Sequence, residues 1–281
     1  MKSFPRLAVA ATLFHALLFT GCYQVPVTGR HAINLVDDAQ VTKMSIAAFD
    51  DMKAHNPISK DKERIEQLKR VGERLQKVIS IWDMPDADWE FVVFDVPDIN
   101  AFAMAGGKVG VFVGLFKIIS NDDQLASVIA HEISHVTARH VHEQLSQGLL
   151  METGGMLGSI AMMGTGAGYL TQTALMNVYG LGTAASGFAF DRNKEKEADY
   201  IGLMYMARAG FDPEEAVAVL EKLEQETAGM GGGGPAWMST HPSNPDRIAA
   251  LQAAMPKALA AREKSVIKGT PVLIKDTSLS K

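Results

Sequence analysis

The sequence of 281 residues predicts an α+β fold that is mainly helical, with long helices packed beside a small three-stranded sheet. Charged segments carry apolar residues at three- and four-residue spacing, which indicates amphipathic helices with one buried face. Between residues 89 and 113 the pattern changes to short runs rich in Val and Phe around a Gly-Gly pair, which predict strands. Hydrophobic residues make up 47% of the chain and charged residues 21%, a composition typical of a globular protein.

Net charge and cysteine content narrow the classes of function. The formal net charge is −5 and no basic stripe is present, so we expect no nucleic acid partner. Cys22 is the only cysteine, and an intramolecular disulfide is therefore excluded.

Residues 1–22 are predicted to be a signal peptide and not part of the fold. After two basic residues comes the apolar run Leu7–Phe19, which is too short to be a good membrane-spanning helix. The string that ends at Cys22 resembles a bacterial lipobox, in which the cysteine becomes the acylated N-terminus. Tyr23 rather than Asp follows it, a pattern that implies an outer-membrane lipoprotein facing the periplasm. An uncleaved membrane anchor and an ordinary signal peptide are the alternatives.

The mature chain is divided into a tether, residues 23–36, and a single domain, residues 37–281. Pro26 and Gly29 punctuate the tether. Capping residues and apolar spacing then predict the helices in chain order. They are expected at residues 37–54, 59–80, 122–146 and 193–209, with a further helix capped at 212–215 and a final short helix after Pro245. The strands are expected at residues 89–94, 100–103 and 108–113.

Two segments of the domain have an unusual composition. Residues 153–190 carry no charge and many glycines, which weaken any long helix. We expect a lid or plug over the active site there, with a membrane-dipping hairpin or plain core as alternatives. Residues 229–236 include four consecutive glycines and are expected to form a mobile loop.

The strongest motif in the sequence is His131-Glu132-Ile133-Ser134-His135. On a helix, His131 and His135 differ by about 40° in direction and about 6 Å along the axis. Both imidazoles can therefore bind one Zn²⁺, and Glu132 is placed to act as general base on zinc-bound water. A catalytic zinc site has three protein ligands and one open position, so a third ligand must come from elsewhere in the chain.

Histidines close to this motif do not supply the third ligand. The elongated metzincin pattern is excluded because Val141 and Ala138 stand where it needs His and Gly. On a continuous helix His140 faces away from His131, and His142 lies too far along the axis. Both are interpreted as partly exposed residues on a helix face.

The third ligand is expected on the helix at residues 193–209. Glu195 and Asp199 lie four apart on one helical face, so Glu195 can bind the zinc while Asp199 accepts a hydrogen bond from the far nitrogen of a zinc-bound His. The resemblance to thermolysin-like sites implies that this partner is His131. Glu197 points about 200° away from Glu195 and is expected to be solvated or salt-bridged.

At this point the sequence resembles the CAAX prenyl protease and HtpX-like family of zinc metallopeptidases, in its bacterial periplasmic lipoprotein branch. The shared elements are the HExxH motif, the ExxxD element 195–199, the strand Asn100-Ala101-Phe102-Ala103 followed by Gly106-Gly107, and an HP-x₄-R element that runs from His241 to Arg247. The resemblance implies a gluzincin-like fold, one Zn²⁺ per chain and endopeptidase activity in envelope protein quality control.

Two further assignments concern the substrate. The strand from Asn100 to Ala103 is expected to bind a peptide as an added β-strand. His241 follows the glycine loop. It is expected either to donate a hydrogen bond to the oxyanion or to occupy the fourth zinc position. The alternative is a purely structural role in a helix-capping turn. Arg247 is expected to orient His241 or to bind a substrate carbonyl.

We therefore expect a zinc endopeptidase that degrades unfolded or misassembled envelope proteins and is held at the membrane by a lipid anchor. An assembly chaperone for outer-membrane proteins, with latent protease activity and the assembly machinery as its partner, is the alternative. A purely structural zinc protein is the third reading, and it would have no use for a base at Glu132.

Overall fold

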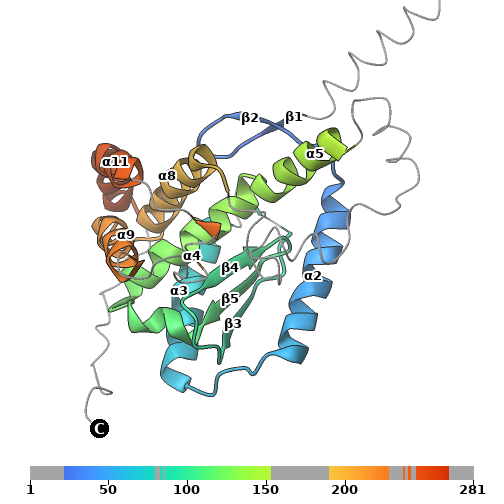
Figure 1. The fold of residues 1–281 in the computed structure, drawn as a ribbon. Helices are drawn as coiled ribbons and strands as arrows, with labels where there is room; N and C mark the ends of the chain where they lie inside the picture. Colours follow the sequence, from blue (N-terminus) through green and yellow to red (C-terminus); the bar gives the residue numbers. More distant parts are fainter. Residues whose placement is uncertain are drawn as a thin grey trace, which may run out of the picture.

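The computed structural model describes residues 22–79, 83–84, 86–152, 190–227, 237, 240–241 and 245–265. These residues form a mainly helical α+β fold around one small sheet, which confirms the predicted fold class (Figure 1). Most of the predicted signal peptide, the uncharged segment 153–189 and the glycine loop 229–236 lie outside the described residues. Among the described residues, no helix combines the length and the apolar character needed to cross a bilayer.

The described residues form two small groups of strands, β1–β2 and β3–β5, and a set of helices. The strands are β1 (Cys22–Gln24), β2 (His31–Ile33), β3 (Glu90–Phe94), β4 (Ala101–Met104) and β5 (Lys108–Phe112). The helices are α2 (Asp38–His55), α3 (Lys62–Ile79), the 3₁₀ helix η1 (Val113–Lys117), α4 (Asp122–Thr137), α5 (His140–Glu152), α8 (Arg192–Arg208), α9 (Glu214–Thr227) and α11 (Pro245–Glu263).

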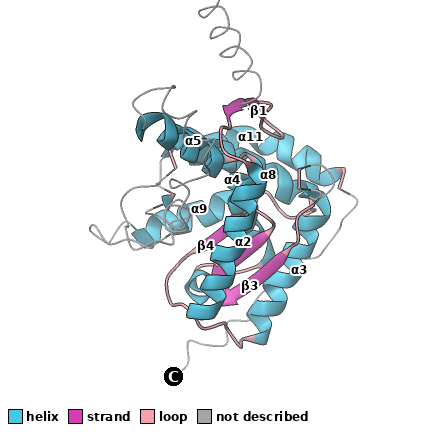
Figure 2. Cartoon of the chain, turned by 90° about the vertical axis from the view of Figure 1, so that its right-hand side faces the viewer, coloured by secondary structure: helices cyan, strands magenta, loops and turns pink. Residues whose placement is uncertain are grey.

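The central sheet has the order β3-β5-β4, with β4 and β5 joined as an antiparallel hairpin and β3 parallel to β5. The hairpin turn requires positive φ at Gly106 and Gly107, 88° and 80°, which glycine adopts at little cost. Both faces of the sheet are buried, because alternate residues of β4 and β5 join two different cores. One core faces α2, and the other faces α3 and α4 (Figure 2).

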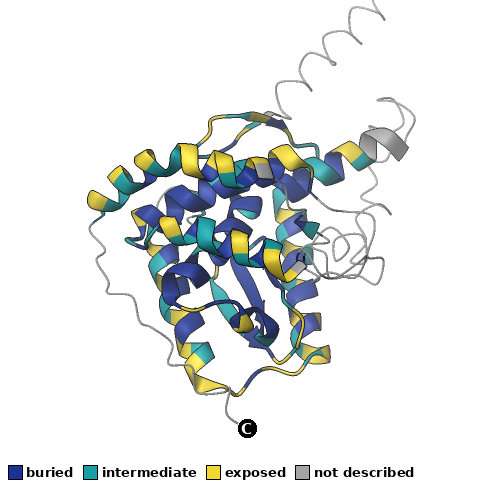
Figure 3. Cartoon of the chain, turned by 60° about the vertical axis from the view of Figure 1, so that its left-hand side comes forward, coloured by how far each residue is buried: buried dark blue, intermediate teal, exposed yellow. Residues whose placement is uncertain are grey.

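Helix α4 lies in the middle of the molecule, against β4 on one side and α8 on the other (Figure 1). Buried residues fill the interior of the molecule, and exposed ones lie on its outer helices (Figure 3). Asn121 caps its N-terminus by accepting a hydrogen bond from the Gln124 amide. Helix α8 crosses α4 at Gly202, where an added Cβ would stand 2.9 Å from the His131 backbone nitrogen. A glycine at this crossing lets the two helices approach closely enough to share one site.

Two expectations about the helices are corrected. The single helix 122–146 is two helices, because Arg139 adopts φ 55° and turns the chain between α4 and α5. The guanidinium of Arg139 lies over the Tyr23 ring and pairs with Asp38, so tertiary contacts hold this turn. The final helix is not short: α11 has 19 residues and continues through Pro256.

The segment 23–36 also differs from the extended tether that we expected. Strands β1 and β2 pair as an antiparallel hairpin that packs on the domain. The Tyr23 hydroxyl donates to the Thr137 carbonyl at 2.7 Å, and Arg30 forms ion pairs with Glu143 and Glu197. This hairpin is therefore part of the folded body.

Candidate metal centre

The HExxH motif lies on the last two turns of α4, in the interior of the protein. His131, Glu132 and His135 are 6%, 4% and 3% exposed. The helical spacing points both imidazoles to the same side, with their ring centroids 4.8 Å apart. The local geometry expected from the sequence is therefore present.

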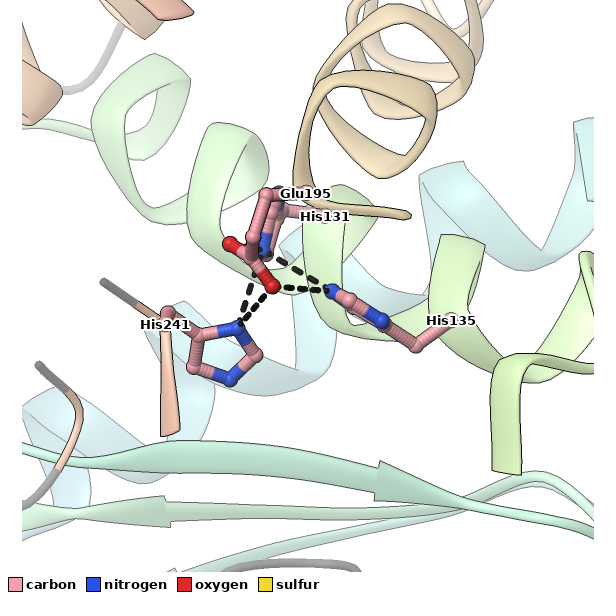
Figure 4. Close-up of side chains that lie close together, drawn as sticks. All are labelled: His131, His135, Glu195 and His241. Carbon is pink, nitrogen blue, oxygen red and sulfur yellow. Dashed lines mark hydrogen bonds and ion pairs between the residues drawn. The ribbon is translucent and has the colours of Figure 1, made fainter. Parts of the chain in front are cut away.

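Two residues from distant segments complete the cluster. Glu195, on the first turn of α8, is fully buried, and His241 approaches from the segment before α11. One donor atom from each of His131, His135, Glu195 and His241 lies within 4.8 Å of the other three (Figure 4). The structure thus brings the proposed third ligand and the ambiguous histidine to the same point.

Four of the six distances between these donor atoms are close to the separation of ligands around one metal ion, and all four atoms lie within 4.8 Å of one another. The His135 Nε2 atom is 3.2 Å from His131 Nε2 and 3.4 Å from Glu195 Oε1. The His241 Nδ1 atom is 3.4 Å from His131 Nε2 and 3.0 Å from Glu195 Oε1. Ligands bonded to Zn²⁺ at its usual distances would stand about 3.3 Å apart at the corners of a tetrahedron. Three nitrogens and one carboxylate oxygen are also a donor set that Zn²⁺ accepts.

The far nitrogen of His131 faces Asp199, as the sequence predicts. His131 Nδ1 is 3.0 Å from Asp199 Oδ1. Burial alone would lower the pKa of His131, but Asp199 and Glu195 raise it to about 10. The raised pKa favours a protonated His131 ring, so a metal ion at Nε2 competes with a proton.

Arg247, expected to orient His241 or to bind a substrate carbonyl, contacts two carboxylates of α8. Its guanidinium donates from Nε and Nη2 to the two Asp199 oxygens, each at 2.7 Å, and Nη1 is 2.9 Å from Glu195 Oε2. The side chain is 1% exposed, so it has no surface with which to bind a substrate carbonyl. Arg247 holds the Asp199 and Glu195 carboxylates, which are opposite in charge to it and are also buried.

Trp237, which the sequence reasoning missed, contacts both the base and the fourth donor. Its indole Nε1 donates to Glu132 Oε1 at 2.8 Å, and its ring stacks on His241 at 4.8 Å between centroids. The Trp237 amide also donates to the Ile99 carbonyl at 3.2 Å, just before β4. One signal was available: Trp237 precedes His241 by four residues, so one helical turn places the two rings together.

The residues Asn100 to Ala103, expected to bind substrate, lie beside the cluster on and just before β4. Strand β4 pairs with β5 and with no other strand of the described part of the chain, and its other side runs along α4. The Asn100 carbonyl accepts the Phe112 amide on the β5 side, whereas the Ile99 carbonyl points the other way to Trp237. The free edge next to the metal site is thus partly occupied by the chain's own Trp237.

His140 does not face away from the site, as a continuous helix would require. The turn at Arg139 brings its Nδ1 to 3.0 Å from Nδ1 of His135, and its Nε2 to 3.0 Å from Glu197 Oε2. Its side chain is completely buried, and burial lowers the pKa of His140. His142 is buried as well, but it lies 3.3 Å from Asp38.

Comparison with known proteins gives an independent result. The model of peptidase family M48 matches residues 62–255. The chain is 35% identical over 197 residues to the mitochondrial metalloendopeptidase OMA1 of Schizosaccharomyces pombe, covering 69% of this chain and 55% of that protein. It is 32% identical over 230 residues to the beta-barrel assembly-enhancing protease of Escherichia coli, covering 80% of this chain and 46% of that protein. The chain thus spans about half the length of the curated relatives it matches.

Proposed function

Because the chain belongs to peptidase family M48, we propose that its buried cluster binds one Zn²⁺ and hydrolyses peptide bonds within protein chains. Family membership confirms the metallopeptidase family that the sequence predicted, and zinc as the metal is part of the proposal. The relatives described above are named OMA1 and beta-barrel assembly-enhancing protease, so they do not single out the CAAX prenyl protease and HtpX-like branch.

The observation that carries the proposal is the convergence of four buried donors next to the Glu132 carboxylate. His131, His135 and Glu195 are the ligands in this proposal. When bound, the zinc supplies a Lewis acid for the scissile carbonyl and lowers the pKa of water at the site. Glu132 takes the proton of the attacking water and delivers it to the leaving amine.

We propose that the described arrangement is a resting state. His241 Nδ1 lies where a fourth ligand would be, and its Nε2 is 3.5 Å from Glu132 Oε1. Trp237 holds Glu132 by a hydrogen bond and lies at the edge of β4. Movement of both residues would free the fourth position, the base and the strand edge, after which His241 could donate to the oxyanion.

The sequence and the relatives support a proposal for the substrate and the location. The free edge of β4 suits an extended, unfolded segment, because main-chain pairing makes little demand on side chains. The lipobox-like string at Cys22 supports an outer-membrane lipoprotein of the bacterial envelope. A relative named for β-barrel assembly supports envelope proteins as substrates.

Replacing Glu132 with Gln tests the peptidase. We expect unchanged zinc content and a loss of casein cleavage of at least about 100-fold, since a positioned general base contributes on that order. Measuring zinc by metal analysis in wild type, Glu132→Gln and a chelated sample separates loss of metal from loss of the base. Cleavage that survives in Glu132→Gln would refute the mechanism.

The assembly chaperone is the second candidate, and the blocked state of Glu132 favours it. If the Glu132→Gln protein binds zinc and supports every cellular phenotype of the wild type, the chaperone is the better assignment. If the phenotype is lost with the peptidase activity, proteolysis is the function.

A further inference from the structure

A line of polar contacts, buried at His135 and His140 and partly exposed at its outer end, connects the HExxH helix to the N-terminal hairpin. His135 Nδ1 is 3.0 Å from His140 Nδ1, and His140 Nε2 is 3.0 Å from Glu197 Oε2. Glu197 then accepts hydrogen bonds from Arg30 Nε and the Thr28 hydroxyl, both at 2.7 Å. His140 is fully buried, and it is reached only because the chain turns at Arg139 between α4 and α5.

The proton positions along this line follow from the metal site. If Nε2 of His135 binds the metal, the remaining proton of its neutral ring is on Nδ1, which can then donate to His140 Nδ1. His140 must accept there, so its own proton is on Nε2, where it donates to the Glu197 carboxylate. The Arg30 guanidinium supplies the opposite charge next to that carboxylate. Every donor in the line therefore faces an acceptor.

The other ligand histidine has a matching arrangement. His131 Nδ1 faces Asp199, and Arg247 closes that pair from the far side. Helix α8 thus supplies the ligand Glu195 and the two carboxylates that face the ligand histidines' side of the network. Asp199 contacts His131, and Glu197 contacts His140. The chain of contacts from Glu197 is longer, because His140 lies between the Glu197 carboxylate and the ligand His135.

We propose that His140 is a positioning residue for His135, anchored by Glu197, and that Arg30 ties the metal site to the β1–β2 hairpin. The proposal rests on the proposed metal site. Partners of this kind set the ring orientation and the tautomer of a ligand, and their loss lowers metal affinity by roughly 10- to 100-fold. The hairpin at residues 22–33 would then contribute to metal binding although it lies outside the residues that match the family model.

The principal test compares His140→Leu with His142→Leu. Both remove a buried imidazole from the start of α5, but His142 pairs with Asp38 and has no contact with the metal cluster among the interactions described. We expect His140→Leu to weaken zinc binding about 10- to 100-fold in competition with a chelator, and His142→Leu to leave it within about threefold. With Co²⁺ as the probe, His140→Leu should also change the visible absorption spectrum, which reports ligand geometry.

Variants of Glu197 and Arg30, at the end of the line farthest from His135, keep the proposal testable if His140→Leu does not fold. Glu197→Gln retains the size of the side chain but removes the charge that fixes the His140 proton, and Arg30→Gln removes its partner. We expect a graded loss of zinc affinity, larger for Glu197→Gln, whereas His140→Asn, which keeps an acceptor near His135, should recover part of the loss of His140→Leu.

The outcomes separate this proposal from the proposed function. If wild-type protein binds no zinc, the metal centre itself is refuted. If wild type binds zinc and folded His140→Leu and Glu197→Gln bind it with the same affinity and the same Co²⁺ spectrum, only the positioning role is refuted. Equal losses in His140→Leu and His142→Leu would show a general packing effect and also overturn the proposal.

Discussion

Gly202→Ala is expected to damage the metal site without touching any ligand. The new Cβ would stand 2.9 Å from the His131 nitrogen and 3.1 Å from the Ala130 carbonyl carbon, where ordinary contacts begin at 3.4 Å. Backbone cannot rotate away, so α4 and α8 must separate by about 0.5 Å, more than the ±0.2 Å that metal–ligand distances tolerate. We expect zinc affinity to fall at least about tenfold.

The stability change combines two opposing effects. Overpacking costs about 1–3 kcal/mol, while exchanging Gly for Ala within a helix returns about 0.5–1 kcal/mol. We therefore expect the free energy of unfolding of the metal-free protein, measured in urea, to fall by about 1–2 kcal/mol.

Gly72→Ala is the matched control. Its Cβ would meet the Phe91 ring at 2.5 Å, so it is also overpacked, but it lies on α3, against β3. It should lower stability and leave zinc affinity unchanged. A Gly202→Ala protein that is more stable than wild type, or that binds zinc as tightly, would refute the close crossing of α4 and α8.

Three further changes test the surroundings of the site. Arg247→Met leaves the Asp199 and Glu195 carboxylates buried without the guanidinium that pairs with them. The free energy of unfolding in urea should therefore fall by about 3–5 kcal/mol, and a loss below about 1 kcal/mol would contradict the buried ion pairs. His241→Ala should raise basal casein cleavage because the fourth position is released. A fall of about 100-fold would show that the role of His241 at the oxyanion outweighs its blocking of the site. Burial acts to raise the pKa of Glu197, but hydrogen bonds from His140, Thr28 and Arg30 outweigh it and lower the pKa to about 2, below the 4.5 of a free Glu. Because the folded pKa is the lower one, the stabilisation is complete above pH 4.5 and is lost as the pH falls towards 2; after allowance for solvent screening it is about 1–2 kcal/mol. In metal-free protein the stability difference between wild type and Glu197→Gln should shrink from pH 7 to pH 2.5, and a constant difference would contradict the lowered pKa.

Local spacing was sufficient to predict the parts of the site that lie on single helices. His131 and His135 share a face of α4 because four residues make about one helical turn, and the same rule pairs Glu195 with Asp199 on α8. The capping residue Asn121 marks where α4 begins, as expected.

Contacts distant in sequence decided the rest, since no local period encodes them. The turn at Arg139 is held by Tyr23 and Asp38, and this turn alone carries His140 to His135. Likewise, the indole of Trp237 reaches Glu132 across 105 positions of sequence.

The sequence by itself therefore determined the chemistry of the HExxH and ExxxD elements, because those residue types at those spacings can serve one ion. Only the tertiary structure decided which neighbours orient them and what blocks them. Close approach of α4 and α8 at Gly202 brings Glu195 to the two histidines. Packing of α11 against α8 makes Arg247 a buried counter-charge, and the segment before α11 sets His241 beside Glu195, because burial and distance in space depend on the packing of the whole chain.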